Sequence, residues 1–541
     1  MYTTSPVAAG DNGTRFQVVV SNSAGQITSS PATLTVVAAG IDVVTYHNDN
    51  ARTGQNLNET ILTLTNVNST NFGKLAFFAT DGKVDAQPLY LSSVNIAGGT
   101  HNVLYVATEH ASLYAFDADT GAVLWHITLL ANAETPSDDH GCSQITPEIG
   151  ITSTPVIDRT AGTNGIIYAV GMSKNAAGTY FQRLHALDLT TGAELLGGPT
   201  TVQASYPGTG DNSVGGNVIF DPKQYAERAG LLLLNHTIYT TWTSHCDFRP
   251  YTGWVIAYNA DTLAQSNVLN LTPNGSEGSV WMSGTAPAAD SAGNIYFLDA
   301  NGTFEATLNS GGFPAQGDFG NAFLKLSTSS GLKVADYFAT FDTVVKSNGD
   351  IDLGSGGALL LPDLLDGSGQ TWHLAVGAGK DGNLYVVNRD NMGKFNSASN
   401  NIYQEFGGAL PGGVFGMPAY FNNTVFYGSV GSTLKAFSIT NARLSSAPTS
   451  GSSNTFVYPG STPSISANGA SNGIVWAHEN SNPAVLHAYN AADLTQELYN
   501  SNQAGARDQF GPGNKFITPT IANGKVYVGT TNGVSVFGLL P

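Results

Sequence analysis

Residues 104–125 read LYVATEHASLYAFDADTGAVLW. This stretch holds two short runs rich in aromatic and aliphatic residues, Leu104 to Thr108 and Leu113 to Phe116, as in half-buried strands. The DADTG sequence that follows, Asp117 to Gly121, favours a tight turn. The stretch therefore predicts a pair of antiparallel strands followed by a turn.

The same unit recurs along the chain, and recurrence at this spacing is typical of repeat folds. The eight copies lie at 103–125, 166–194, 231–262, 294–332, 374–393, 425–440, 474–494 and 526–537. A strand of small residues precedes each copy, usually with a proline, as suits the crowded centre of a ring. These strands contain residues 86–88, 153–155, 284–287, 416–418, 461–463 and 517–519, with 214–216 and 355–357 in the remaining two places.

Eight strand pairs with eight inner strands predict an all-β protein with an eight-bladed β-propeller over residues 41–541. Closure into a ring removes exposed sheet edges. We expect the additional strand Val43 to His47 to complete the last blade and close the ring. An open solenoid is the alternative.

Residues 1–40 precede the repeats and contain two alternating strands, Arg15 to Val20 and Ala32 to Val37, around the turn 22–25. They resemble the last two strands of a bacterial immunoglobulin-like module. Two strands cannot bury a sandwich core, so we expect a partial module or linker here.

Composition limits the classes of partner. The net charge is −18, which disfavours binding to nucleic acid. No apolar run is long enough to span a membrane.

The scarcity of lysine is typical of an exported protein, so we expect a secreted or cell-surface monomer. Cys142 and Cys246 form either one disulfide or two buried thiols, and an oxidising compartment favours the disulfide.

The stretch 112–125, SLYAFDADTGAVLW, together with 45–54, TYHNDNARTG, resembles the PQQ-repeat propellers of quinoprotein alcohol dehydrogenases from about residue 41 to the end. The resemblance implies a central funnel with a site for the quinone and for calcium. It implies Asp85 as a funnel carboxylate, Trp281 as the flat floor under the quinone and Lys380 as a cation on the quinone oxygens. It also implies Asn301 as a calcium ligand and Asp352 as the catalytic base beside calcium.

Other positions depart from that family. Its two adjacent cysteines are reduced to Cys142 followed by Ser143, and Glu148 stands where an arginine is expected. The calcium-binding glutamate of the second blade has no counterpart in residues 171–182. Calcium therefore stays a candidate cofactor, whereas the departures argue against PQQ.

Each retained residue also has a structural interpretation. Trp281 is a common type of blade-packing aromatic, Asn301 a turn residue, Asp352 a turn cap and Lys380 a solvated turn lysine. Residues 244–254 form a long connection that includes Arg249. A Cys142–Cys246 bridge would tie this connection to another over one mouth of the funnel.

These observations favour an exported binding or scaffold propeller that holds a small molecule or glycan in its funnel. The first alternative is an oxidoreductase of alcohols or sugars that depends on PQQ and calcium. The second is a hydrolase or lyase that uses funnel carboxylates from different blades. The candidate carboxylates are Asp85, Glu148, Glu277 and Asp352.

Overall fold

The structure is a computed structural model that describes residues 14–23, 25–33 and 42–541. The chain divides into two compact units, Met1–Ile41 and Asp42–Pro541. In the first unit β1 (Arg15–Phe16) pairs with β4 (Ala32–Thr33), and β2 (Val19–Asn22) pairs with β3 (Gly25–Thr28). The immunoglobulin-like assignment stays a prediction, and its residues 34–37 lie outside the described residues.

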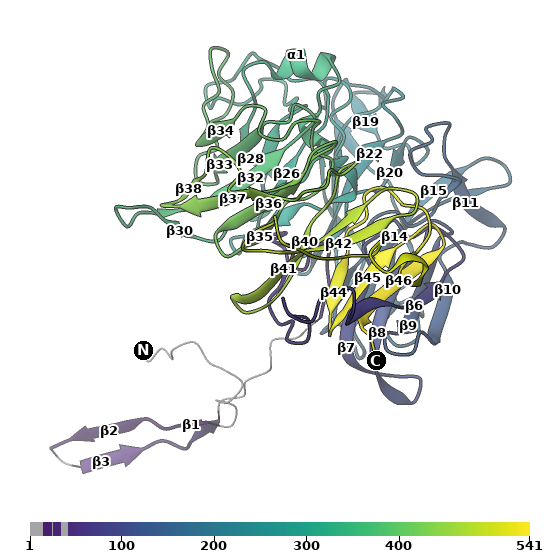
Figure 1. Ribbon diagram of the computed structural model, residues 1–541. Coiled ribbons are helices and arrows are strands. Elements are labelled where there is room, and N and C mark those ends of the chain that lie inside the picture. Colours follow the sequence, from purple (N-terminus) through teal and green to yellow (C-terminus); the bar gives the residue numbers. More distant parts are fainter. Residues whose placement is uncertain (1–13, 24, 34–41) are drawn as a thin grey trace. The chain divides into compact units, whose positions relative to one another are not determined.

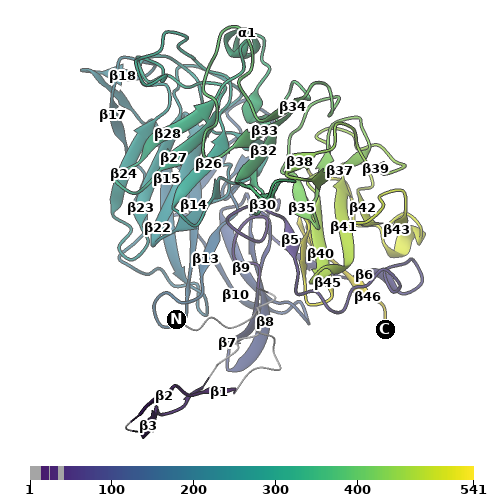
Figure 2. The same cartoon turned by 90° about the vertical axis from the view of Figure 1, so that its left-hand side faces the viewer.

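The second unit is an eight-bladed β-propeller, as predicted, with the blades formed by eight antiparallel sheets. Figures 1 and 2 show the chain passing from the blade of β7–β10, through the teal and green blades, to the yellow strands β44–β46, which lie beside β6. Neighbouring innermost strands contact one another, for example β13 with β21 and β44 with β7. The innermost strands therefore form the inner ring.

The blades, each from its innermost strand outward, are composed as follows. Blade 1 contains β7 (Leu89–Ile96), β8 (Gly99–Ala107), β9 (Ser112–Asp117) and β10 (Val123–Thr128). Blade 2 contains β13 (Val156–Asp158), β14 (Ile166–Asn175), β15 (Tyr180–Asp188) and β16 (Thr200–Thr201), with β11 (Glu134–Asp138) and β12 (Glu148–Ile149) added. Blade 3 contains β21 (Leu232–Leu234), β22 (Thr237–Ser244), β23 (Trp254–Asn259) and β24 (Gln265–Asn270), with β20 (Tyr225–Ala226) added. Blade 4 contains β25 (Ala288–Ala289), β26 (Asn294–Leu298), β27 (Phe323–Ser327) and β28 (Lys333–Phe338).

Blade 5 contains β29 (Leu359–Leu360), β32 (Leu374–Ala378), β33 (Leu384–Asn388) and β34 (Gln404–Phe406). Blade 6 contains β35 (Ala419–Phe421), β36 (Thr424–Gly428), β37 (Leu434–Thr440) and β38 (Arg443–Leu444), with β39 (Ser450–Gly451). Blade 7 contains β40 (Ser464–Asn468), β41 (Ser471–Glu479), β42 (Val485–Asn490) and β43 (Glu497–Asn500), and β5 (Gln55–Asn56) joins β40. Blade 8 contains β44 (Thr520–Ala522), β45 (Lys525–Gly529), β46 (Gly533–Leu539) and β6 (Phe72–Ala79).

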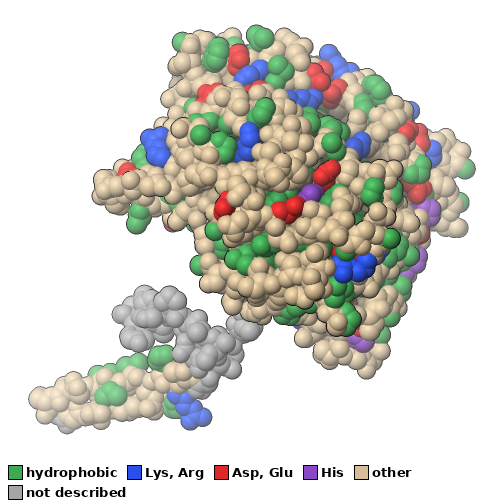
Figure 3. Space-filling view, viewed as in Figure 1, with side chains coloured by type: hydrophobic (Ala, Val, Ile, Leu, Met, Phe, Trp, Pro, Cys, Tyr) green, Lys and Arg blue, Asp and Glu red, His purple; other side chains and the backbone are tan. Residues whose placement is uncertain are grey.

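Short elements lie between the blades. They are β17 (Ser205–Pro207), β18 (Ser213–Val214), β19 (Asn217–Ile219), β30 (Leu364–Leu365), β31 (Thr371–Trp372), α1 (Thr343–Asn348) and three 3-10 turns, Met282–Gly284, Leu353–Ser355 and Gly505–Arg507. None of the helices among the described residues has the length and apolarity needed to cross a membrane. Charged side chains are sparse and scattered over the face shown in Figure 3.

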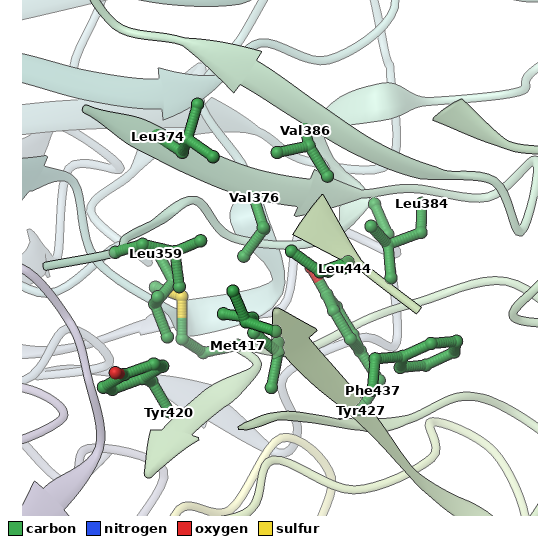
Figure 4. Close-up of a cluster of buried hydrophobic side chains, with 14 of the residues drawn as sticks. Leu359, Leu374, Val376, Leu384, Val386, Met417, Tyr420, Tyr427, Phe437 and Leu444 are labelled. Atoms are coloured by element: carbon green, nitrogen blue, oxygen red, sulfur yellow. The ribbon is translucent and has the colours of Figure 1, made fainter. Parts of the chain in front are cut away.

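Packing between neighbouring blades builds the core. Figure 4 shows one such cluster, in which apolar side chains of blade 5 meet those of blade 6. The labelled members are Leu359, Leu374, Val376, Leu384 and Val386 on one side and Met417, Tyr420, Tyr427, Phe437 and Leu444 on the other. The aromatic residues of the repeats are thus mainly core, where they bury large apolar areas.

The strand that closes the ring is not the one expected. β6 (Phe72–Ala79) pairs with β46 along its length and forms the outer strand of blade 8. The expected strand, Val43 to His47, makes an isolated bridge from Val43 to Tyr90 instead. A second expectation was also wrong, because residues 214–216 lie at the exposed β18–β19 hairpin and the inner strand of blade 3 is β21.

Residues 43–56, here called the hub segment, bond to the innermost strands of all eight blades in order. In each blade the contact falls on the second residue of the innermost strand: Tyr90, Ile157, Leu233, Ala289, Leu360, Tyr420, Ile465 and Ile521. Six of these contacts are backbone to backbone, and the Asn50 and Asn56 side chains supply those to blades 3 and 8. The hub segment therefore occupies the centre of the ring.

Two wholly buried side chains hold the hub segment in place. Arg52 donates to the carbonyl oxygens of Pro287 and Tyr46, each at 2.8 Å, and to the Thr45 hydroxyl. The His47 ring nitrogens contact the carbonyl oxygens of Arg52 and Pro463 at 2.8 and 2.9 Å. Burial lowers the pKa of Arg52 to about 10.

Candidate functional site

A cavity of about 270 Å³ lies where loops from blades 2 to 7 converge. Several wall residues, such as Arg228, Trp281 and Asp352, come shortly before the innermost strands of blades 3, 4 and 5. The hub segment meets the same strands further along, so it closes the centre below the cavity. The cavity is therefore a blind funnel.

Trp281 forms an aromatic surface in this funnel, flanked by two cations. The Lys380 ammonium lies 5.6 Å and the Arg228 guanidinium 5.8 Å from the ring centroid. Phe415 meets the indole edge-on at 5.9 Å. The indole nitrogen is buried without a hydrogen-bond partner. Such a surface suits stacking of a flat molecule.

Asp352 and Lys380 form an ion pair in the funnel wall. The Lys380 Nζ lies 2.5 Å from an Asp352 oxygen and 2.5 Å from an Asp350 oxygen. The other Asp352 oxygen accepts the backbone N–H of Asn301 at 2.7 Å. Burial lowers the pKa of Lys380, but the two carboxylates outweigh burial and raise it, so the ammonium stays charged.

A disulfide joins two loops at the funnel wall, as expected from the two cysteines. Cys142 and Cys246 are bonded with their Cα atoms 5.5 Å apart, and both line the cavity. Beside them the rings of His140 and His245 stack at 4.0 Å. Burial lowers the pKa of His245 to about 3, with a smaller contribution from the charge of His140. We call residues 139–146 and 244–250 the lid loops.

A smaller hollow of about 20 Å³ adjoins the funnel and shares Gln144, Ile145 and Arg228 with it. Asp85 lies in this hollow, where one oxygen accepts from Asn514 at 2.6 Å and the other is 3.5 Å from Lys83. Asp85 and Asp352 thus belong to two connected spaces.

The predicted site residues divide into three groups. Trp281, Asp352, Lys380 and the two cysteines line the large cavity. Asp85 lines the small hollow, and Asn301 supports Asp352 from behind. Like Asn301, three further residues line neither space: Glu148 bonds to His110 at 2.9 Å, Arg249 pairs with Asp211 at 2.8 Å, and Glu277 is half-buried with its pKa raised by burial.

Arg228 is a functional candidate that the sequence did not reveal. It follows β20, is buried, and lines both spaces. The only signal in the sequence is a charged pair, Glu227-Arg228, directly before the apolar run 229–234 in a chain with few cations. The burial of that pair becomes visible only when the blades are assembled.

The donor set does not fit calcium. The Asn301 side-chain oxygen is buried without a partner, but both Asp352 oxygens are engaged and Lys380 already balances the charge. Among residues 42–541 and the described part of the first unit, no group of three or more His, Cys, Asp or Glu can hold a metal ion. The quinone set is incomplete too, because Glu148 lies at His110 and the cysteines are not adjacent.

Comparisons with known proteins agree with the fold. Residues 50–149 match the family described as outer membrane protein assembly factor BamB. No curated protein matches the chain in sequence. Among solved structures, the quinohemoprotein alcohol dehydrogenase from Comamonas testosteroni is 13% identical with a TM-score of 0.61, covering 92% of this chain and 80% of that one.

Two further structures are similar to the same extent. Alcohol dehydrogenase ADHIIG from Pseudomonas putida HK5 is 12% identical with a TM-score of 0.60, covering 92% of this chain and 80% of that chain. A europium-containing methanol dehydrogenase is 12% identical with a TM-score of 0.58, covering 92% of this chain and 98% of that chain. The protein thus has the PQQ-repeat propeller fold of the quinoprotein alcohol dehydrogenases.

Proposed function

We propose that this protein is a binding propeller that holds a small molecule in its blind funnel, stacked on Trp281. The observation that carries the proposal is the Trp281 ring itself, which lies in the wall of the cavity between two cations. A structural tryptophan would instead be surrounded by blade side chains, as Trp242, Trp254 and Trp476 are. The disulfide at the lid loops is consistent with an extracytoplasmic location.

The test is ligand binding followed by tryptophan fluorescence and isothermal calorimetry, with flat aromatic molecules and oligosaccharides as probes. Replacement of Trp281 by Leu should weaken binding of the best probe at least tenfold, because stacking is lost. The matched control is Trp372→Leu, since Trp372 is a half-buried residue of the short strand β31 and lies outside both cavities. Equal affinity of the Trp281 variant and the wild type would refute the proposal.

A quinone-dependent oxidoreductase is the second candidate, favoured by the position of Asp352. This buried carboxylate lies in the same cavity wall as Trp281 and is held by Lys380 and by the Asn301 backbone. The reaction would require PQQ, which supplies the oxidising group. The test is dye reduction by the protein supplied with PQQ and alcohols or sugars, compared with Asp352→Asn. Turnover that disappears in the variant would establish this candidate.

We do not propose the hydrolase alternative. Of the four candidate carboxylates, only Asp352 lines the large cavity, and Asp85 lies in the adjoining hollow. Glu148 and Glu277 line neither space. The four carboxylates on which this alternative depended are therefore not brought together, although Asp139, Asp247 and Asp350 line the large cavity beside Asp352.

A further inference from the structure

We infer that the ligand of the funnel carries an anionic group, a carboxylate or a phosphate, that binds between Arg228, Lys515 and Lys83. We call these three residues the basic subsite. The inference rests on the proposed function, because it names the chemical class of the molecule that stacks on Trp281.

Arg228 carries the argument, because it is a buried cation without an anion. The residue is 7% exposed, and its Nε is buried without a hydrogen-bond partner. No carboxylate among residues 42–541 forms an ion pair with its guanidinium. Burial of an uncompensated charge is costly, and proteins keep such groups where a ligand completes them. Burial lowers the pKa of Arg228, which Asp85 partly offsets.

Arg228 lies where a ligand in the funnel can reach it. Its guanidinium lies 5.0 Å from the centroid of Phe516 and 5.8 Å from that of Trp281. It also lines both the funnel and the small hollow. A molecule stacked on Trp281 can therefore place a substituent against Arg228 without leaving the funnel.

Lys515 and Lys83 add two cations to the hollow. Among the residues that the structure describes, the Lys515 Nζ donates only to a neutral acceptor, the Gln144 side-chain oxygen, at 3.0 Å. Burial lowers the pKa of Lys515, and the charges of Arg228 and Lys83 lower it further. An anion in the hollow would remove this repulsion.

The carboxylates of the hollow do not balance these three cations. Asp85 contributes one negative charge beside Lys83. The other nearby acid, Glu109, is wholly buried and accepts from Gly150 and Thr152. Burial, and then the charge of Asp85, raise the pKa of Glu109 well above its usual range, which disfavours a second negative charge beside Asp85. The hollow therefore has an excess of positive charge in a chain whose net charge is −18.

The size of the hollow limits what enters it. At about 20 Å³ it takes a single small group, whereas the funnel of about 270 Å³ takes a ring system. The ligand class is thus a flat aromatic molecule with one anionic substituent. Arginine and lysine together bind carboxylates and phosphates through charge-assisted hydrogen bonds.

The experiment compares three naphthalene probes of the same ring size by calorimetry on the whole chain. These are 2-naphthoate, 2-naphthyl phosphate and the neutral 2-naphthamide. We expect at least one anionic probe to bind tenfold or more tighter than the amide, and the advantage to fall with added salt. The two anionic arms identify whether carboxylate or phosphate is preferred.

Variants then locate the effect. Arg228→Gln and Lys515→Gln should each remove most of the anionic advantage, measured as the affinity of the anionic probe relative to that of the amide in the same variant. Lys333→Gln is the matched control, because Lys333 is exposed and outside both spaces. If the Arg228 variant does not fold, Lys515→Gln still tests the basic subsite. Lys515 is only partly buried, so its replacement should not disturb folding.

The outcomes separate the two proposals. If no naphthalene probe binds, charged or neutral, and no oligosaccharide binds either, the proposed function fails. If only oligosaccharides bind, the flat aromatic anion inferred here is overturned and the binding funnel stands. If the amide binds as tightly as both anions, or if both variants keep the full anionic advantage, the binding funnel stands and the basic subsite is overturned.

Discussion

The two ends of the central channel differ in how their buried polar groups are satisfied. At the closed end, Arg52 and His47 donate to or contact carbonyl oxygens, and the hub segment bonds to every blade. At the open end, Arg228 Nε, His245 Nε2 and Trp281 Nε1 are buried without partners. Both ends bury cations and aromatic rings. Arg52 makes four hydrogen bonds and leaves only its Nη2 without a partner, whereas the Arg228 side chain makes no hydrogen bond to the described residues.

This difference separates structure from function. Paired polar groups stabilise the fold, whereas unpaired ones cost stability and persist where a ligand completes them. Two buried arginines, Arg52 and Arg228, make the comparison direct, because the same substitution should affect them with opposite sign.

The largest effect is expected at the closed end. Arg52→Met should lower the free energy of unfolding by about 3 kcal/mol, because the carbonyl oxygens of Pro287 and Tyr46 lose their charged donor. Urea unfolding measures this, with Arg443→Met as the control, since Arg443 is exposed. If Arg52→Met lowers the free energy of unfolding no more than Arg443→Met does, the hydrogen bonds of Arg52 do not stabilise the closed end.

The disulfide at the open end should matter next. The double variant Cys142→Ser, Cys246→Ser should lower the free energy of unfolding by about 2 kcal/mol. The reason is that the disulfide joins residues 104 positions apart, and its loss increases the conformational entropy of the unfolded chain. Hydrogen exchange should rise in the lid loops and stay unchanged in the hub segment. Faster exchange in the hub segment would show that the two ends are not independent.

His245 should make the open end sensitive to acid. Its folded-state pKa of about 3 lies below that of the unfolded chain, so the unfolded chain takes up the proton more readily. The free energy of unfolding should therefore fall as the pH decreases from about 6.5 toward 3.

The His245→Gln variant should lose about 1.5 kcal/mol less than the wild type between roughly pH 6.5 and 4.5. The matched control is His236→Gln, because the His236 side chain is 75% exposed. Identical pH profiles for the wild type and the His245 variant would contradict the expectation.

The smallest effect is the most informative. Arg228→Met should raise the free energy of unfolding of the ligand-free protein by about 1 kcal/mol, because it removes a buried charge whose Nε has no hydrogen-bond partner and which burial destabilises. Thermal and urea unfolding without ligand measure it beside Arg52→Met. Destabilisation equal to that of the Arg52 variant would show that Arg228 is a structural residue.

The sequence predicted the fold because each blade repeats a local pattern. Aromatic runs, Asx-Gly turns and inner-strand prolines are local features, so eight blades could be counted without coordinates. The disulfide was expected because one pair of cysteines leaves one pairing. Trp281 and Lys380 were predicted as site residues through the resemblance, and the Lys380 Nζ lies 5.6 Å from the Trp281 ring centroid.

The errors concern contacts between distant segments. Val43 to His47 has the alternation of a strand, but its backbone groups bond to different blades, which periodicity along one segment does not show. The three glycine-rich residues 214–216 satisfied the small-residue pattern at an exposed hairpin. Arg228 escaped notice because burial of a charge depends on tertiary packing.

The hub segment also provides one contact position for each of the eight blades. Its eight contacts fall in chain order on equivalent positions of successive inner strands, so each blade has its own place on a template that lies outside the repeats. Loss or duplication of one repeat, the commonest change in repeat proteins, would leave one contact unmatched and shift all later ones. Blade number in this propeller is therefore set by a short non-repeating sequence that is complete before the first blade begins, and the ring can grow or shrink only if that sequence changes with it.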